Sequence, residues 1–107
     1  MINLLIAEDQ AMLLTTLASL LDLEDDICVV HQSTNGADAL TFICDKNKPD
    51  IDILITDIEM PKMTGIELVQ AIKEKGLNIK PIILTTFSRA GYLRRAMDAG
   101  VKGYLLK

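Results

Sequence analysis

The sequence predicts a doubly wound α/β domain built on a five-stranded parallel sheet. Five short aliphatic runs alternate with segments of helical periodicity, which is the pattern of a parallel sheet with crossover helices. The runs are almost continuous in Ile, Leu and Val, as is typical of strands covered on both faces. The 107 residues, of which 50% are hydrophobic, suffice for one compact domain with a core and are too few for two.

The expected strands comprise residues 2–7, 27–31, 51–56, 81–85 and 103–106. The first expected helix follows Asp9, because four leucines at spacings of i, i+4, i+7 and i+8 share one face: Leu13, Leu17, Leu20 and Leu21. Asn35 is expected to cap the second helix.

Capping signals also mark the third and fourth helices. Thr64 and Glu67 have the spacing of a capping box, and Gly76 is a plausible stop for the helix that they begin. Ser88 is expected to cap the fourth helix, which ends near Gly100. The resulting order is βαβαβαβαβ, and right-handed crossovers make this a doubly wound sheet.

Charge and composition exclude several classes of protein. The net charge of −4 argues against direct binding of this segment to a phosphate backbone, and no apolar run approaches the length of about 18 residues that a membrane span needs. Cys28 and Cys44 have no CxxC spacing, so we expect two small buried hydrophobic residues in a reducing cytoplasm. His31, the only histidine, is expected on the second strand or at its end, without a metal or relay role.

Polar side chains follow four of the expected strands. They are Glu8 and Asp9 after the first strand, Thr56 and Asp57 at the third, Thr85 and Thr86 at the fourth, and Lys107 after the fifth. Because the carboxyl ends of parallel strands meet at one edge of the sheet, we expect these groups to converge there.

The converging groups suit phosphoryl transfer. Three carboxylates would repel one another in a partly desolvated cleft unless a divalent cation lay between them, and their hard oxygens favour Mg²⁺ or Mn²⁺. A lysine and a hydroxyl beside such a cation can neutralise and hydrogen-bond a phosphoryl group. Asp57, at the centre, is then a candidate nucleophile that forms an aspartyl-phosphate.

These motifs resemble the receiver domain of two-component response regulators, over residues 2–107. The resemblance rests on Glu8-Asp9, on Asp57-Ile58-Glu59-Met60-Pro61 with Gly65, on Leu84-Thr85-Thr86, and on Gly103-Tyr104-Leu105-Leu106-Lys107. Three details are similar to the LuxR/NarL-type transcription regulators: Glu8-Asp9-Gln10, Thr85-Thr86-Phe87 and Ala99-Gly100-Val101-Lys102-Gly103-Tyr104. The family fold is flavodoxin-like, with the strand order 2-1-3-4-5.

The resemblance implies a role for each matching residue. Asp57 would accept a phosphoryl group from the phosphohistidine of a sensor histidine kinase, or from a small donor such as acetyl phosphate. Asp9 and Asp57 would ligate Mg²⁺ together with the backbone carbonyl of Glu59, and Glu8 would act through water.

The remaining implied roles concern the phosphoryl group and the switch. Lys107 would contact a phosphoryl oxygen, and Thr85 would move toward the phosphoryl group while Tyr104 changes its rotamer. The fourth helix and fifth strand would repack with them. Glu59 and Thr86 lie at variable positions that tune the attack of water on the aspartyl-phosphate.

A receiver usually continues into a fifth helix, and LuxR/NarL-type proteins continue into a helix-turn-helix domain. The sequence ends at Lys107, so we expect a truncated receiver that reaches DNA only through an absent domain. Apolar surface left open beside the first helix would favour self-association or domain swapping.

Two other functions stay open at this stage. A phosphate-independent interaction module would keep the fold without the switch. A haloacid-dehalogenase-type phosphatase also uses an aspartyl-phosphate with Mg²⁺, and Asp57-Ile58-Glu59 faintly matches its DxD motif. The leading hypothesis remains a phosphoacceptor switch that acts only on its own phosphorylation and dephosphorylation, without being a metabolic enzyme.

Overall fold

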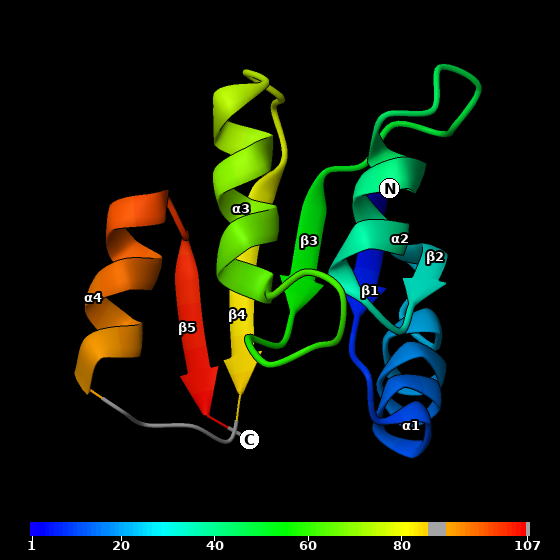
Figure 1. Cartoon of the computed structure of the whole chain (residues 1–107). Coiled ribbons are helices and arrows are strands. Elements are labelled where there is room, and N and C mark those ends of the chain that lie inside the picture. Colours follow the sequence, from blue (N-terminus) through cyan, green and yellow to red (C-terminus); the bar gives the residue numbers. More distant parts are fainter. Residues whose placement is uncertain (86–89, 107) are drawn as a thin grey trace.

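A single parallel sheet of five strands, in the order β2-β1-β3-β4-β5, organises the computed structural model (Figure 1). The structure describes residues 1–85 and 90–106, except for the side chains of residues 85, 90–94, 104 and 106. The strands are β1 Ile2–Ala7, β2 Ile27–Ser33, β3 Ile53–Thr56, β4 Lys80–Thr85 and β5 Gly103–Leu106. The helices are α1 Ala11–Asp22, α2 Gly36–Ile43, α3 Gly65–Glu74 and α4 Ala90–Ala99. The doubly wound sheet and its strand order are therefore confirmed.

The register of the sheet places three strand ends side by side. Ala7, the last residue of β1, pairs with Ser33 of β2 on one side and with Thr56 of β3 on the other. The residues that follow continue this pattern, because Glu8 N–H donates to Ser33 O at 2.9 Å and Asp57 N–H donates to Ala7 O at 3.0 Å. All five strands point the same way, so their carboxyl ends form one edge of the sheet (Figure 1).

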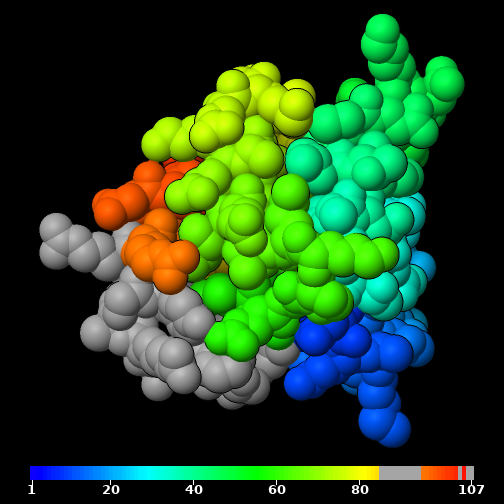
Figure 2. All heavy atoms as spheres, viewed as in Figure 1, coloured from blue at the N-terminus to red at the C-terminus, as the bar shows by residue number. Residues whose placement is uncertain are grey.

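Side chains that alternate along β1 divide the core between the two faces of the sheet. Leu5 and Ala7 pack with residues of α2 and α3, whereas Ile6 packs on the opposite face with Leu14 and Ala18 of α1. A further cluster joins α3 and α4 to β4 and comprises Ile58, Ile66, Val69, Ile83, Ala96, Ala99 and Val101. Figure 2 shows the face that α2 and α3 cover, where their side chains close over the sheet.

The expected helix ends are confirmed where the structure describes them. Asn35 Oδ1 accepts from Asp38 N–H at 2.7 Å, and Thr64 with Glu67 forms both hydrogen bonds of a capping box. Gly76, with φ +66°, follows the C-cap of α3, and Gly100, with φ +100°, follows α4. Ser88, the expected cap of α4, lies outside the described residues.

Several details differ from the expectation, including the start of β4 at Lys80 rather than at residue 81. β2 runs two residues further, to Ser33, and β3 begins at Ile53 rather than at residue 51. Leu20 is 58% exposed, because it lies about 120° around the helix from Leu14, the centre of the buried stripe. Cys44 is exposed because it lies at the C-cap of α2, so the expectation that it is buried was wrong. Cys28 is half-buried, and both thiols are free.

Among the described helices, none has the length and apolar character that crossing a membrane requires.

Candidate functional site

Three acidic residues meet at the carboxyl-end edge of the sheet. Glu8 and Asp9 follow β1, and Asp57 follows β3, its neighbour in the sheet. One carboxylate oxygen from each residue lies within 4.8 Å of the others. The predicted convergence of these carboxylates is therefore confirmed.

Backbone amides orient the two buried members of this cluster. Glu8 is only 2% exposed, and its Oε2 accepts from Gln10 N–H at 3.1 Å. Asp57 is 6% exposed, and its Oδ1 accepts from Ile58 N–H at 2.7 Å. Asp9, by contrast, is exposed. The cluster thus combines two fixed, desolvated carboxylates with one that faces solvent.

The donor set suits a hard divalent cation. Carboxylates at this separation repel one another, and the repulsion grows as water is excluded from around them. The cluster offers oxygen ligands without sulfur or imidazole, which is the set that Mg²⁺ and Mn²⁺ prefer. Glu8, Asp9 and Asp57 therefore fit such an ion.

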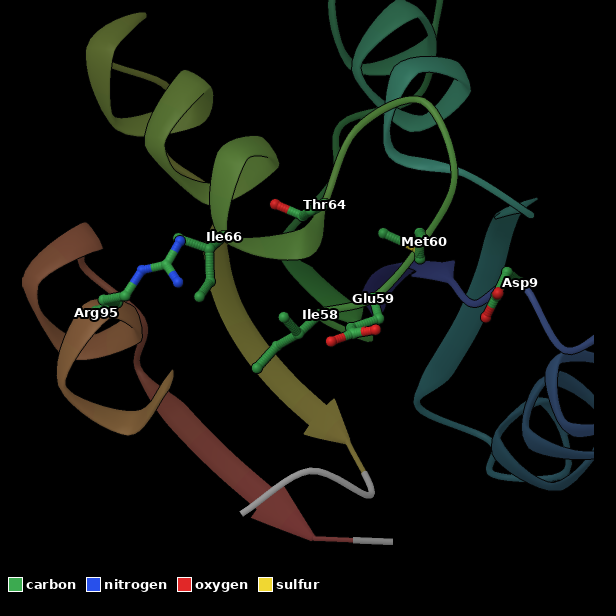
Figure 3. Close-up of a pocket in the computed structure, with 7 residues that line it drawn as sticks. All are labelled: Asp9, Ile58, Glu59, Met60, Thr64, Ile66 and Arg95. Carbon is green, nitrogen blue, oxygen red and sulfur yellow. The ribbon is translucent and has the colours of Figure 1, made fainter. Parts of the chain in front are cut away.

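A pocket of about 390 Å³ opens beside the cluster. Figure 3 shows its lining, which consists of Asp9, Ile58, Glu59, Met60, Thr64, Ile66 and Arg95. Asp9 lies on the β1 side and Arg95 on the α4 side, with Ile58 and Glu59 of the β3–α3 loop between them (Figure 3). The pocket thus runs from the acidic cluster toward α4.

Close packing fixes the loop that carries Asp57 and Glu59. Gly65 N–H donates to Ile58 O at 2.8 Å, and a Cβ at Gly65 would overlap the backbone oxygen of Asp57. Only glycine therefore allows α3 to begin so close to the end of β3. The first turn of α3 is therefore packed directly against the backbone of Asp57.

Comparison with known proteins identifies the family of this chain. A family model described as the response regulator receiver domain matches residues 4–107. The chain belongs to this family. The earlier resemblance, which rested on short motifs at the strand ends, is thereby confirmed.

Similar proteins point to transcriptional regulators. The transcriptional regulatory protein DesR of Bacillus subtilis (strain 168) is 56% identical over 107 residues, which are 100% of this chain and 51% of that protein. The uncharacterized transcriptional regulatory protein YvfU of the same strain is 52% identical over 107 residues, 100% of this chain and 52% of that protein. The receiver domain thus spans about half the length of these curated relatives.

A solved structure agrees with both the fold and the subfamily. The crystal structure of a DNA-binding response regulator of the LuxR family from Staphylococcus aureus has a TM-score of 0.91 and 42% sequence identity. The match covers 99% of this chain and 86% of that chain. The similarity to LuxR/NarL-type regulators is thereby confirmed as well.

The other predicted site residues of the receiver domain lie at β4 and β5. Thr85 is the last residue of β4, and Tyr104 lies in β5 with Ile83 of β4 as its partner in the register. The side chains of Thr85 and Tyr104 lie outside the described part of the structure, as do Thr86 and Lys107 entirely. Their roles therefore stay predictions.

A polar network that the sequence did not predict lies next to the acidic cluster. Ser33 is 1% exposed, and its hydroxyl donates to Asp38 Oδ2 at 2.7 Å, while His31 Nε2 lies 3.2 Å from the same oxygen. The hydrogen bond from Ser33, followed by that from His31, lowers the pKa of Asp38 below its ordinary value. The rule that polar residues follow strand ends would have found Ser33 if β2 had been expected to reach it.

Proposed function

We propose that this receiver domain is a phosphorylation-dependent switch of a two-component response regulator, with Asp57 as the phosphoacceptor. The observation that supports this proposal best is the meeting of Glu8, Asp9 and Asp57 within 4.8 Å at the sheet edge. A sensor histidine kinase is the proposed donor, and acetyl phosphate can replace it. The P–N bond of the phosphohistidine breaks and a P–O bond to an Asp57 oxygen forms, while the released imidazole keeps the electron pair.

Asp9 and Asp57 would hold Mg²⁺ with the backbone carbonyl of Glu59, and Glu8 would contribute through water; Mn²⁺ is the alternative ion. When bound, the cation supplies positive charge that offsets the charge on the phosphoryl oxygens. The chain itself orients the nucleophile, because the Ile58 N–H bond at 2.7 Å fixes the rotation of the Asp57 carboxylate. The burial of Asp57 and Glu8 keeps water from one side of the reacting group.

Further residues would complete the switch. Lys107 would contact a phosphoryl oxygen, and Thr85 and Tyr104 would move with the phosphoryl group, so that α4 and β5 repack. Glu59 and Thr86 would set how fast water attacks the aspartyl-phosphate. Glu59 lines the pocket beside Asp9, which supports such a role.

The output would be transcriptional control in the cytoplasm. The matched relatives are named transcriptional regulators and are about twice as long as this chain. We propose that the phosphorylated receiver acts through self-association and through a helix-turn-helix domain that contacts DNA. On this proposal its only chemistry is its own phosphorylation and dephosphorylation.

The position of the Asp57 motif favours the switch over a phosphatase. Asp57-Ile58-Glu59 follows β3, the third strand in the chain and the central strand of the sheet. The corresponding motif of haloacid-dehalogenase-type phosphatases follows the first strand of a larger domain. A phosphate-independent interaction module is the remaining alternative.

The proposed function is tested by the intact mass of the chain after incubation with Mg²⁺ and acetyl phosphate. We expect a gain of one phosphoryl group that Asp57→Ala abolishes. Asp50→Ala is the matched control, because Asp50 is also an acidic residue near β3, but it is exposed and precedes that strand. No mass gain in the unaltered chain, or a gain that persists in Asp57→Ala, contradicts the proposal.

A further inference from the structure

The first turn of α2 lies between the two loops that carry the acidic cluster. On one side, the backbone leads from Ser33, whose carbonyl accepts from Glu8 N–H at 2.9 Å, to Asn35, the N-cap of α2. On the other side, Gly36 approaches the β3–α3 loop so closely that a Cβ there would overlap the carbonyl oxygen of Met63. A displacement of this turn therefore reaches both loops.

Asp38 links the first turn of α2 to the end of β2. Its Oδ2 accepts from the buried Ser33 hydroxyl at 2.7 Å and lies 3.2 Å from His31 Nε2. The ring of His31 in turn stacks on Phe42 of α2, with centroids 4.0 Å apart and an interplanar angle of 3°. β2 and α2 are thus joined by a polar contact and a ring contact on the same side.

Asp38 also faces the other loop. Lys62 lines a surface hollow together with Asp38, and its charge contributes to the lowered pKa of that carboxyl. Lys62 has a φ of +69°, so the backbone of the β3–α3 loop is held in the left-handed region at the residue that faces Asp38. Asp38 thus contacts Ser33, whose carbonyl is bonded to Glu8 N–H, and it also lies near Lys62 of the β3–α3 loop.

We propose that Asp38 is a positioning residue for the metal-binding cluster: through Ser33 it fixes the turn that carries Glu8 and Asp9 relative to the loop that carries Asp57. This inference rests on the proposed function, because it concerns the cation that the cluster would bind. Without an acceptor at residue 38, the buried Ser33 hydroxyl loses its partner there and the end of β2 shifts to find another. Glu8 follows, since its amide is bonded to the Ser33 carbonyl.

An ordinary helix-capping role for Asp38 does not account for this arrangement. An acidic residue in the first turn stabilises a helix through the helix dipole and needs no side-chain partner. Asn35 already caps α2 by accepting from Asp38 N–H at 2.7 Å. The contact of the Asp38 side chain with Ser33 and His31 is additional to the cap, and it points toward β2 rather than along the helix.

The test is the affinity for Mg²⁺ alone, measured by calorimetry or by NMR titration of the folded chain. We expect Asp38→Ala and Ser33→Ala each to weaken binding about tenfold, as loss of a residue behind a metal ligand typically does. The double variant should bind Mg²⁺ no more weakly than either single variant, because both substitutions remove the same contact. Asp38→Asn keeps an oxygen that accepts from Ser33, so it should retain most of the affinity.

The control is Ile43→Val, which removes a methylene from a buried residue at the other end of α2. It lowers stability without touching the network, and its Mg²⁺ affinity should stay unchanged. Unchanged Mg²⁺ affinity in both Asp38→Ala and Ser33→Ala overturns the inference. So does an Asp38→Asn variant that binds Mg²⁺ as weakly as Asp38→Ala, because that result would indicate a long-range charge effect. If the unaltered chain binds no Mg²⁺ and gains no phosphoryl group, the proposed function itself fails and the inference fails with it.

Discussion

Acidic residues gather at both ends of the sheet, but the two groups differ in burial. At the carboxyl ends of the strands, Glu8 and Asp57 are 2% and 6% exposed. Near the amino ends of β1 and β3, Asp50 and Asp52 are exposed to solvent. Acidic residues are present at both ends, so their presence alone does not mark a site.

The two groups also hold the backbone differently. Asp52 Oδ2 accepts from Asn3 N–H at 2.8 Å, and Asn3 Nδ2 donates to the Asp50 carbonyl at 2.7 Å, so these residues join the starts of β1 and β3. Glu8 and Asp57 instead accept from the amides of residues that follow them, which aims their carboxylates at a common point. One end uses acidic residues to join strands, and the other places them where a cation fits.

The largest expected effect comes from disturbing the close approach at the carboxyl end. We expect Gly65→Ala to lower the free energy of unfolding by about 3 kcal/mol, because the added Cβ overlaps the Asp57 backbone. Gly76→Ala is the matched control at the other end of α3. A Cβ added at Gly76 meets no atom within 4 Å, so the substitution is opposed only by the positive φ of that residue. This backbone strain costs about 1 kcal/mol. Urea unfolding measures both, and equal losses would show that the packing against Asp57 is unimportant.

We expect Mg²⁺ to stabilise the folded chain by binding to the cluster at the carboxyl ends of the strands, and not to Asp50 and Asp52 near the amino ends. At 100 times its dissociation constant, a single bound ion raises the free energy of unfolding by about 2.7 kcal/mol. If Asp9→Asn weakens the site tenfold, the same Mg²⁺ concentration adds only about 1.4 kcal/mol. Asp52→Asn should keep the full gain.

The measurement is thermal unfolding of the three proteins with and without Mg²⁺. If Mg²⁺ raises the Tm of Asp9→Asn as much as that of the unaltered chain, but does not raise the Tm of Asp52→Asn, the ion binds at the amino ends of the strands and the prediction is wrong. Asp52→Asn is a fair control because its amide oxygen can still accept from Asn3 N–H.

Sequence reasoning predicted the fold and the acidic cluster because both depend on local patterns. Aliphatic runs define the strands, parallel strands bring their carboxyl ends together, and Asp9 and Asp57 follow two such runs. The sequence predicts an end of β2 at His31, because Gln32 and Ser33 are polar and resemble a loop. These two residues remain in the strand because β1 pairs with them through Ile6 and Ala7.

The proposed role of Asp38 could not be predicted from the sequence, for a different reason. An acidic residue three positions after the Asn35 cap is fully explained by local helix preferences, so nothing signals a further contact. Its partners come from another element, and their distances depend on how α2 packs against β2. Tertiary contacts of this kind leave no periodicity in a single sequence.

The smallest expected effect is a pH dependence that separates Asp38 from the exposed acidic residues. The Ser33 and His31 hydrogen bonds lower the pKa of Asp38 in the folded chain, and nearby Lys62 acts in the same direction. The folded form therefore binds the proton more weakly than the unfolded form. It follows that the stability contributed by Asp38 is fully present above the ordinary pKa of 3.8 and is lost as the pH falls through the lower, folded value.

Asp38→Asn removes this titrating group while keeping an acceptor for Ser33. The free energy of unfolding of the unaltered chain should therefore exceed that of Asp38→Asn at neutral pH, and the difference should shrink as the solution is acidified below the ordinary pKa. Urea unfolding of both proteins at neutral and acidic pH measures the difference. Because Asp38 is about half exposed, with 53% of its side chain accessible, solvent screens the contacts and the difference should be well below that caused by Gly65→Ala. A difference that widens as the pH falls below 3.8 would mean that the carboxylate is held less favourably in the folded chain than in the unfolded one, and it would contradict the Ser33–Asp38 contact as a stabilising one.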